Sequence, residues 1–558
     1  MQISAQIALI LWLSVAGSTP ELARGQGMPS ASPAPTIVHP AYPNGTGTAL
    51  GQQIEALLTD PSVARAHWGI AVTTLDGTPL YGVDEGKLFR PASNNKIFTT
   101  ATAIALLGPG KTFDTRVFGK FDAATGTVSG NLTLAGGGDA NFGAEDLPYL
   151  SRSERVKQAG AAPQPMAPQP PALTDLASLV DQLVAKGVKR VTGDIVGDDT
   201  LYPYEPYAES WSADDLVWGY GAPVSALTID NNQVTLIIKP GQPATVQLEQ
   251  NVPYYTVESQ VQTVAAGAHA EGVQIERQPG SRVIRIYGSI AADAHPDIEE
   301  LAIADPADYA AMALRAMLEQ RGIRVEGTAR AQHRLPSDAN GYRSELLTPN
   351  PCDAAAVAGE ACTVECAVAR SAPSGELLAS HSSAALAEDV VLTNKVSQNL
   401  HAETFLHNLG LRAPCGGGSI VDGARLVRAN LLHAGLDPDD FLFFDGSGLS
   451  DHDLVAPRAA VKFLEYVAQQ PWFAQWKASL PSAGEDGTLS GRFPDPPVKD
   501  HLFAKTGTLG ESRALSGYLD AASGRTVIFS ILVDDHTPVT SADRVTMDKI
   551  VTAIAAAE

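Results

Sequence analysis

The sequence predicts an α/β (α+β) protein in which one domain, split in the chain, receives an inserted β-rich region. Two observations lead to this prediction. A strand pair and a helix come first, before residue 108, and strands followed by a helix come last, after residue 502. Between them, from about 113 to 300, short strands alternate with turns. The simplest geometry places the two ends of the chain in one domain.

The first element predicted is a β-hairpin over 66–82, where apolar and polar residues alternate around an Asp-Gly turn. Apolar residues then recur at helical spacing over 97–107, and Gly108 ends the run. Ser93 and Lys96 are therefore expected at the N-terminus of a helix.

The middle of the chain is predicted to be β-rich because short apolar runs alternate with turn residues. One helix is expected there, over about 173–186, and the Pro- and Ala-rich stretch 159–172 is predicted to be a disordered loop. The clearest strands expected in this region are 130–134, 193–197 and 234–238.

Helical periodicity returns over about 306–321 and 384–411. A final helix is expected from about Ser541, a residue type that suits a helix N-cap. The strands predicted before that helix are 503–507, 514–519 and 526–533. The predicted division is 49–115 with 298–558 as the split domain, and 116–297 as an insertion of one or two β-rich modules.

Composition describes a large globular protein and excludes one class of partner. The 558 residues suggest two to four domains, and 44% of them are apolar, enough for sizeable buried cores. The net charge of −23 argues against a nucleic-acid partner, because phosphate binding needs clustered Lys and Arg.

The N-terminus predicts export. An apolar run over 7–17, followed by small residues, is typical of a signal peptide over 1–24, although 1–6 contains no Lys or Arg. The alternative is a start that is not a signal. Residues 25–48, rich in Pro, Ser, Ala and Gly, are predicted to be a disordered linker. The expected location is the periplasm or cell envelope.

Four cysteines occur, at Cys352, Cys362, Cys366 and Cys415. In an exported protein they can form up to two disulfides, with three possible connectivities, and at least one disulfide is expected. A zinc site is the alternative, but no CxxC pair or nearby His supports it.

Three short motifs carry candidate chemistry, and the first is Ser93-Asn94-Asn95-Lys96. Residues three apart share a helix face, so a neutral Lys96 can take the hydroxyl proton of Ser93. A helix N-terminus also favours an oxyanion and a lowered pKa for Lys96. Alone the motif is weak, because a capping Ser followed by a solvated Lys gives the same pattern.

The second motif is Ser397-Gln398-Asn399. The hydroxyl of Ser397 can pass a proton between a lysine and a leaving group, and the amide of Asn399 can orient both substrate and lysine. A capping or turn motif is the alternative interpretation.

The third motif, Lys505-Thr506-Gly507-Thr508, lies on a predicted strand. A substrate can lie against such a strand by strand addition. Lys505 and Thr506 offer a cation and a hydroxyl for a terminal carboxylate, and Gly507 allows close approach of the backbone. The alternative is an ordinary edge strand with a protective Lys.

Together, in this order, the three motifs are the set typical of penicillin-binding proteins and class A β-lactamases. From about residue 50 onward the chain resembles the D-alanyl-D-alanine carboxypeptidase/endopeptidases, the class C low-molecular-mass penicillin-binding proteins. Two further matching stretches lie in the inserted region, which β-lactamases lack. The stretches that carry the resemblance are 136–139, 222–227 with 230–232, 394–395, the Asp-Gly-Ser-Gly-Leu-Ser run at 445–450, and 480–489.

The resemblance implies a penicillin-recognising serine transpeptidase-like domain, an antiparallel sheet flanked by helices, with two small domains inserted. It implies that Ser93 attacks the carbonyl between two D-Ala residues of a peptidoglycan stem peptide or cross-link and forms an acyl-enzyme that water hydrolyses. Lys96 is then the general base, Ser397 the proton relay and Asn399 an orienting group. Backbone N–H groups of Ser93 and Thr508 form the oxyanion hole.

The same resemblance assigns the binding groups. Lys505, Thr506 and Thr508, with Gly507 beside them, are expected to hold the substrate carboxylate. β-Lactams are expected to acylate Ser93 as covalent inhibitors. No metal or organic cofactor is implied, and the oligomeric state is left open.

One subsite departs from the family pattern. The subsite for the diaminopimelate side chain maps to Asp215, Tyr220 and Leu509. Relatives often place an Arg after the run at 445–450, whereas this chain has Asp451 and then His452. A different preference for the third residue of the stem peptide is therefore possible.

Two alternative functions are compatible with the same motifs. A β-lactamase or esterase on the same fold is disfavoured by the inserted region and by the run at 445–450. A non-catalytic peptidoglycan- or β-lactam-binding module is disfavoured by the intact Ser93, Lys96, Ser397 and Lys505. Fast turnover of penicillin is the observation that favours the β-lactamase.

Overall fold

The computed structural model describes residues 39–43, 47–159, 173–250, 252–336, 351–360, 362, 373–537 and 540–558. The predicted signal peptide, most of the predicted linker, the predicted loop after residue 159 and Cys366 lie outside these residues. No helix among the described residues has the length and apolar character needed to cross a bilayer.

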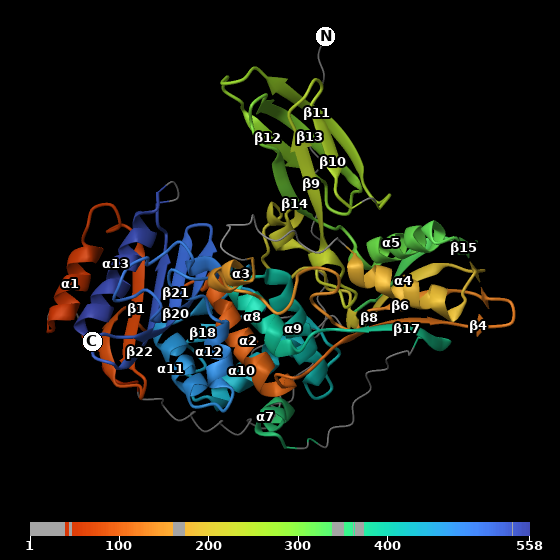
Figure 1. The fold of residues 1–558 in the computed structure, drawn as a ribbon. Helices are drawn as coiled ribbons and strands as arrows, with labels where there is room; N and C mark the ends of the chain where they lie inside the picture. The colour runs from red at the N-terminus through yellow and green to blue at the C-terminus, as the bar shows by residue number, and fades with distance from the viewer. Residues whose placement is uncertain are drawn as a thin grey trace, which may run out of the picture. The chain divides into compact units, whose positions relative to one another are not determined.

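A five-stranded antiparallel sheet places the first two strands, β1 and β2, beside the last three, β20 to β22 (Figure 1). Its strand order is β2-β1-β22-β21-β20, which leaves β20 at one edge. The predicted hairpin and the three predicted C-terminal strands are confirmed. The strands are β1 (His67–Thr74), β2 (Pro79–Val83), β20 (Leu502–Leu509), β21 (Ser512–Asp520) and β22 (Thr526–Asp534).

Helices cover both faces of this sheet, because successive side chains on its strands point alternately into two buried cores. On β22, Ile528 and Leu532 join one core, whereas Phe529 and Ile531 join the other. The second core is closed by α1 (Ala49–Leu58) and α13 (Ala542–Ala557). Helices on the first core are α2 (Asn95–Leu107), α8 (Leu386–Val396), α9 (Asn399–Arg412), α10 (Ile420–His433), α11 (Pro457–Ala468) and α12 (Phe473–Ser479).

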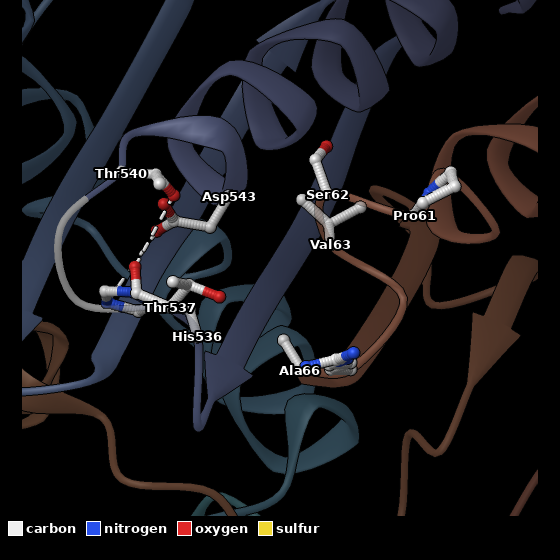
Figure 2. A pocket seen from close by; sticks show the side chains of 9 residues that line it. Pro61, Ser62, Val63, Ala66, His536, Thr537, Thr540 and Asp543 are labelled. Carbon is white, nitrogen blue, oxygen red and sulfur yellow. Dashed lines mark hydrogen bonds and ion pairs between the residues drawn. The ribbon is translucent and has the colours of Figure 1, made fainter.

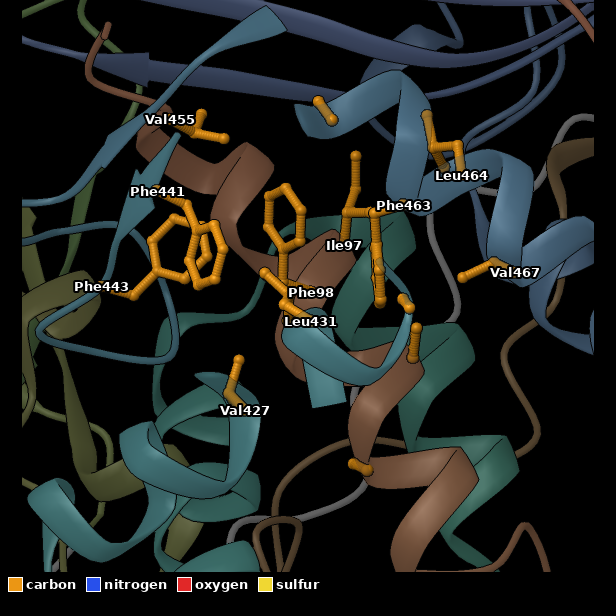
Figure 3. Packing of buried hydrophobic residues seen from close by; sticks show 14 of the residues in the cluster. Ile97, Phe98, Val427, Leu431, Phe441, Phe443, Val455, Phe463, Leu464 and Val467 are labelled. Atoms are coloured by element: carbon orange, nitrogen blue, oxygen red, sulfur yellow. The ribbon is translucent and has the colours of Figure 1, made fainter. Parts of the chain in front are cut away.

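The first core packs around α2 (Figure 3). The Phe98 ring lies 4.8 Å from Phe443 and 5.1 Å from Phe463, measured between centroids. Gly108, with φ +89°, ends α2 where the sequence predicts. Ser541 is the N-cap of α13 as predicted, but its side chain makes no capping hydrogen bond.

The single helical stretch expected over 384–411 is wrong in one respect. The chain forms two helices, α8 and α9, which are separated at Ser397 and Gln398. Ser397 takes a left-handed conformation with φ +64°, and the side chain of Gln398 accepts a hydrogen bond from the N–H of Leu400. Apolar periodicity continues across this break, so the sequence pattern does not reveal it.

The inserted region forms further sheets around a core of its own. The helices there are α3 (Arg152–Ala159), which the sequence did not predict, α4 (Thr174–Lys186) and α5 (Pro306–Gln320). One sheet has the order β16-β8-β6-β3-β17 and another β15-β7-β5-β4; the remaining two are β10-β9-β14 and β11-β13-β12. Their strands are β3 (Asp114–Gly119), β4 (Phe121–Asp122), β5 (Thr127–Val128), β6 (Leu132–Ala135), β7 (Arg190–Val191), β8 (Ile195–Pro203), β9 (Gln233–Lys239), β10 (Thr245–Leu248), β11 (Thr256–Val264), β12 (Gly272–Glu276), β13 (Val283–Ala291), β14 (Asp297–Ala302), β15 (Arg324–Val325), β16 (Ala329–Arg334) and β17 (Glu376–Ser382).

The core of the inserted region also takes in residues beyond the predicted boundary at 297. Residues of α5 are buried in it, and β16 and β17 pair with its strands β8 and β3. The domain boundaries themselves stay a prediction.

Cysteine pairing follows the expectation for an exported protein. Cys352, on α7 (Pro351–Ala358), forms a disulfide with Cys362, with their Cα atoms 5.5 Å apart. The prediction of at least one disulfide is confirmed. Cys415 is also disulfide-bonded, and because paired sulfurs cannot be zinc ligands, the zinc alternative loses three of its four candidates.

A small cavity of about 20 Å³ lies between 61–66 and the start of α13 (Figure 2). His536 and Asp543 line it, both almost fully buried, and Arg513 forms an ion pair with Asp543. The cavity has room for about one water molecule, so it is a packing feature rather than a substrate site.

Candidate active site

Ser93 lies where the chain enters α2. It belongs to a 3₁₀ turn, Ala92–Asn94, that leads directly into the α-helix. The predicted helix N-terminus is therefore present, in a tighter first turn than expected. Lys96, one turn further on, is hydrogen-bonded through Nζ to Ser93 Oγ at 2.9 Å.

Lys96 is held by two further groups from distant parts of the chain. Its Nζ donates to Asn399 Oδ1 at 2.6 Å and to the carbonyl of Ser447 at 2.8 Å. The first two predicted motifs, SxxK and SxN, thus meet at one amine. The side chain of Lys96 is completely buried.

The ionisation of Lys96 is set by burial and by three carboxyl groups. Burial lowers the pKa of Lys96 to about 7, and the charges of Asp445, Glu403 and Asp453 act in the opposite direction. A lysine with this pKa is neutral in about half of the molecules at neutral pH. It can therefore accept a proton from a hydroxyl group.

The run at 445–450 wraps around Lys96 and is held by buried carboxylates. Asp445 accepts hydrogen bonds from the N–H groups of Gly448 and Ser450, each at 2.7 Å. Glu403, on α9, accepts from the N–H of Ser447 at 2.7 Å. These bonds point the Ser447 carbonyl at Lys96. Sequence reasoning missed Glu403, which lies far from the run in the chain and in none of the three motifs.

Gly448 cannot be replaced without moving the turn that carries Ser93. Its φ is +82°, and a Cβ built there would lie 1.8 Å from the carbonyl oxygen of Ala92. The run at 445–450 therefore packs directly against the turn that carries Ser93.

Lys505 lies beneath the site and does not project into it. Its Nζ donates to Ser397 Oγ at 2.8 Å and to the Thr506 carbonyl at 2.9 Å, and the side chain is completely buried. Burial, and then the charge of Lys96, keep the pKa of Lys505 well below its usual value. The second and third motifs thus meet at Ser397.

Strand β20 runs past the nucleophile. A Cβ on Gly507 would lie 2.7 Å from the Pro91 carbonyl oxygen and 3.1 Å from Ser93 N, so only glycine allows this approach. The hydroxyl of Thr506 is hydrogen-bonded to that of Thr488 at 2.7 Å. Thr508 is exposed.

Most of the predicted site residues line one cavity of about 350 Å³. Lys96 and Lys505 lie below its floor, and Thr506 and Gly507 do not line it. The residues that line the cavity are Ser93, Asp215, Tyr220, Ser397, Asn399, Gly448, Leu449, Thr508, Leu509 and Gly510. All three residues of the predicted side-chain subsite are among them.

The inserted region supplies part of this wall. The hydroxyl of Tyr220 donates to Asp215 Oδ1 at 2.9 Å, and Asn399 Nδ2 donates to the Tyr220 carbonyl at 2.9 Å. Burial raises the pKa of Asp215, the bond from Tyr220 lowers it, and the charge of Asp451 raises it further. Arg90 lies 4.0 Å from Asp451 but also pairs with the acidic end of β22.

Comparisons with known proteins agree with this geometry. Residues 50–340 and 354–555 match the model of the D-Ala-D-Ala carboxypeptidase 3 (S13) family. The chain is 30% identical over 515 residues to a D-alanyl-D-alanine carboxypeptidase of Actinomadura sp. (strain R39), covering 89% of this chain and 84% of that protein. It is 25% identical over 452 residues to D-alanyl-D-alanine carboxypeptidase DacB of Haemophilus influenzae, covering 80% of each.

Solved structures support the predicted fold. Penicillin-binding protein 4 of Haemophilus influenzae superposes with a TM-score of 0.69 at 22% identity, covering 90% of this chain and 98% of that one. A complex of that protein with a β-lactam gives 0.65 at 21% identity, covering 91% and 98%. The predicted fold class and family are confirmed: the chain belongs to the D-Ala-D-Ala carboxypeptidase 3 (S13) family, whose members are serine-type peptidases.

Proposed function

We propose that this protein is a serine-type D-Ala-D-Ala carboxypeptidase and endopeptidase in which Ser93 is the nucleophile. The observation that carries the assignment is the 2.9 Å contact between Ser93 Oγ and Lys96 Nζ, with Lys96 buried and its pKa lowered to about 7. A hydroxyl next to a neutral amine in a cavity is an activated nucleophile.

In acylation, the neutral Lys96 accepts the Ser93 proton as Oγ attacks the carbonyl carbon of the penultimate D-Ala. The N–H groups of Ser93 and Thr508 stabilise the oxyanion. When the peptide bond breaks, the Lys96 ammonium gives up the proton it took from Ser93, and this proton passes through the hydroxyl of Ser397, which is hydrogen-bonded to Lys505, to the leaving amine of the terminal D-Ala. Water then cleaves the ester, which releases the shortened peptide and restores the Ser93 hydroxyl.

The buried position of Lys505 refines its expected role. Since its Nζ contacts Ser397, Lys505 supports the proton relay directly and acts on the substrate carboxylate from below. Thr508, exposed on β20 and lining the cavity, is the side chain placed to bind that carboxylate. Thr506, hydrogen-bonded to Thr488, is a weaker candidate.

The side-chain subsite is proposed to favour a cationic group. Asp215 and Tyr220 line the cavity with Leu509, and Asp451 lies close enough to raise the pKa of Asp215. An ammonium group pairs with such carboxylates, whereas an added carboxylate on the substrate is repelled. A third stem residue that ends in an amine alone, or whose carboxyl is amidated, fits this wall better than free diaminopimelate.

The proposed substrates are peptidoglycan stem peptides and cross-links, and β-lactams are proposed to acylate Ser93. Export to the periplasm or cell envelope is the corresponding location. The β-lactamase alternative remains testable, since that enzyme hydrolyses penicillin rapidly whereas a penicillin-binding protein keeps it as a stable ester.

The test is D-Ala release from a pentapeptide, followed by mass spectrometry, for the wild type, Ser93→Ala and the control Ser523→Ala. Ser523 lies in the β21–β22 turn and lines no part of the cavity. We expect loss of D-Ala release and of penicillin labelling in Ser93→Ala alone. Unchanged release by Ser93→Ala would refute the assignment, and rapid penicillin turnover by the wild type would favour the β-lactamase.

A further inference from the structure

A chain of buried polar residues lies directly behind the Ser397–Asn399 turn and has no part in the proposed mechanism. His401, on the first turn of α9, is completely buried. Its Nδ1 lies 2.5 Å from Asp389 Oδ1, and its Nε2 lies 2.9 Å from Asn231 Oδ1. Asp389 is on α8, and Asn231 belongs to the inserted region. One imidazole therefore ties together the two helices that flank Ser397 and the inserted region.

The partners of His401 fix the orientation of its ring. Asn231 Nδ2 donates to Glu145 Oε1 at 3.2 Å, which turns the amide oxygen of Asn231 toward the imidazole. The ring is therefore held at both nitrogens, by Asp389 on one side and by Asn231 on the other.

Other titratable groups surround the contact between His401 and Asp389. Asp139, which precedes the loop carrying Glu145, is buried near it, and burial raises the pKa of Asp139 to about 7 while the charge of His401 lowers it. His381 lies 3.8 Å from Asp139 and 3.6 Å from Asp175. His401 therefore lies among several carboxyl groups, two of which, Asp389 and Asp139, are buried.

The turn that His401 supports needs such support. Ser397 has φ +64°, a conformation that non-glycine residues keep only where the surroundings hold it. Both ends of the Asn399 amide are hydrogen-bonded to other segments: the oxygen accepts from Lys96, and the nitrogen donates to the Tyr220 carbonyl. A small movement of α9 against α8 would misplace the Asn399 amide and the Ser397 hydroxyl together.

We propose that His401 is a positioning residue for the acylation of Ser93. Clamped between Asp389 and Asn231, its imidazole fixes the Ser397–Asn399 turn, and through Asn231 the inserted region becomes part of the support of the active site. This inference rests on the proposed function, since it is read out through acylation of Ser93.

The first test compares acylation rates with a fluorescent penicillin in His401→Gln, Asn231→Ala and the control His407→Gln. His407 is a second buried histidine on α9, bonded through Nδ1 to the Gly418 carbonyl at 2.7 Å, away from the turn. We expect acylation at least about tenfold slower in the first two variants, since a displacement of about 1 Å can cost about 100-fold in rate. We expect the control to stay within about twofold, even if its Tm falls.

The second test separates positioning from general stability. In an Asn399→Ala background, His401→Gln should slow acylation by a smaller factor than it does in the wild type, because one of the two groups that it positions is already gone. A purely structural role predicts that the two losses multiply.

Three results would overturn the proposal: wild-type acylation rates in folded His401→Gln, a loss no larger than that of His407→Gln, or multiplicative losses in the double variant. If His401→Gln does not fold, Asn231→Ala decides, because it removes only one end of the clamp. A failure of the proposed function is distinguishable, since the wild type itself would then not be labelled by penicillin.

Discussion

The pH dependence of Ser93 acylation follows directly from the surroundings of Lys96. Burial lowers the pKa of Lys96 to about 7, and only the neutral amine can accept the Ser93 proton. The neutral fraction rises with pH, from about one hundredth at pH 5 to about one tenth at pH 6 and about nine tenths at pH 8. Acylation should therefore become about tenfold slower for each pH unit below about 7 and reach a plateau above about pH 8.

The assay is the second-order rate of acylation by a fluorescent penicillin between about pH 5 and pH 9, at fixed ionic strength. Circular dichroism at each pH checks that the protein remains folded. Lys96→Arg is the matched control, because a guanidinium keeps a positive charge and is never neutral in this range. It should lower the rate at every pH by about 10²–10⁴, the usual contribution of a general base.

A flat profile from about pH 5.5 to pH 8.5 would refute the reasoning, because it would mean that no group with a pKa near 7 limits acylation. A rate that keeps rising about tenfold per pH unit up to about pH 9, without a plateau, would also refute it. In that case Lys96 would be an ordinary ammonium, and burial would not have lowered its pKa.

Two further predictions concern the walls of the cavity. Gly448→Ala should abolish most acylation and lower Tm, because the new methyl group clashes with the Ala92 carbonyl oxygen. The control is Gly524→Ala, which has φ +84° and nothing within 4 Å and therefore tests the backbone conformation alone. Equal effects of the two substitutions would contradict the clash. Asp451→Arg should shift substrate preference toward stem peptides whose third residue carries a carboxylate. The measurement is the ratio of D-Ala release from lysine- and diaminopimelate-containing pentapeptides in competition. An unchanged ratio would show that residue 451 does not contribute to recognition of that side chain.

Local chemistry explains why so much of the fold could be predicted. The Asp-Gly turn and the alternation around it produced the hairpin β1–β2, and Gly108 stopped α2. The helix break at Ser397 could not be predicted, because apolar periodicity continues through it and only tertiary contacts hold that residue at positive φ. Helix α3 was not predicted because residues 152–157 are exposed and four of these six are charged, so they form no apolar face.

The candidate site was predictable as a list and not as an arrangement. Ser93, Ser397 and Lys505 were found from short motifs, since the spacing of residues within one turn or strand is local. The role of Lys505 changed with the structure, because burial beneath Ser397 is a property of two elements 108 positions apart. His401 carried no signal in the sequence, since a buried histidine on an apolar helix is indistinguishable there from an ordinary core residue.

The sequence by itself determined which groups are available: a serine one helical turn before a lysine, a second serine with an asparagine, and a lysine on a strand. Those choices depend on neighbours within a few residues. Tertiary structure alone decided the pKa of Lys96, the contact of Lys505 with Ser397 and the contribution of the inserted region through Tyr220. The physical reason is that desolvation and charge–charge interactions depend on distances in space, and the groups that set them come from segments far apart in the chain.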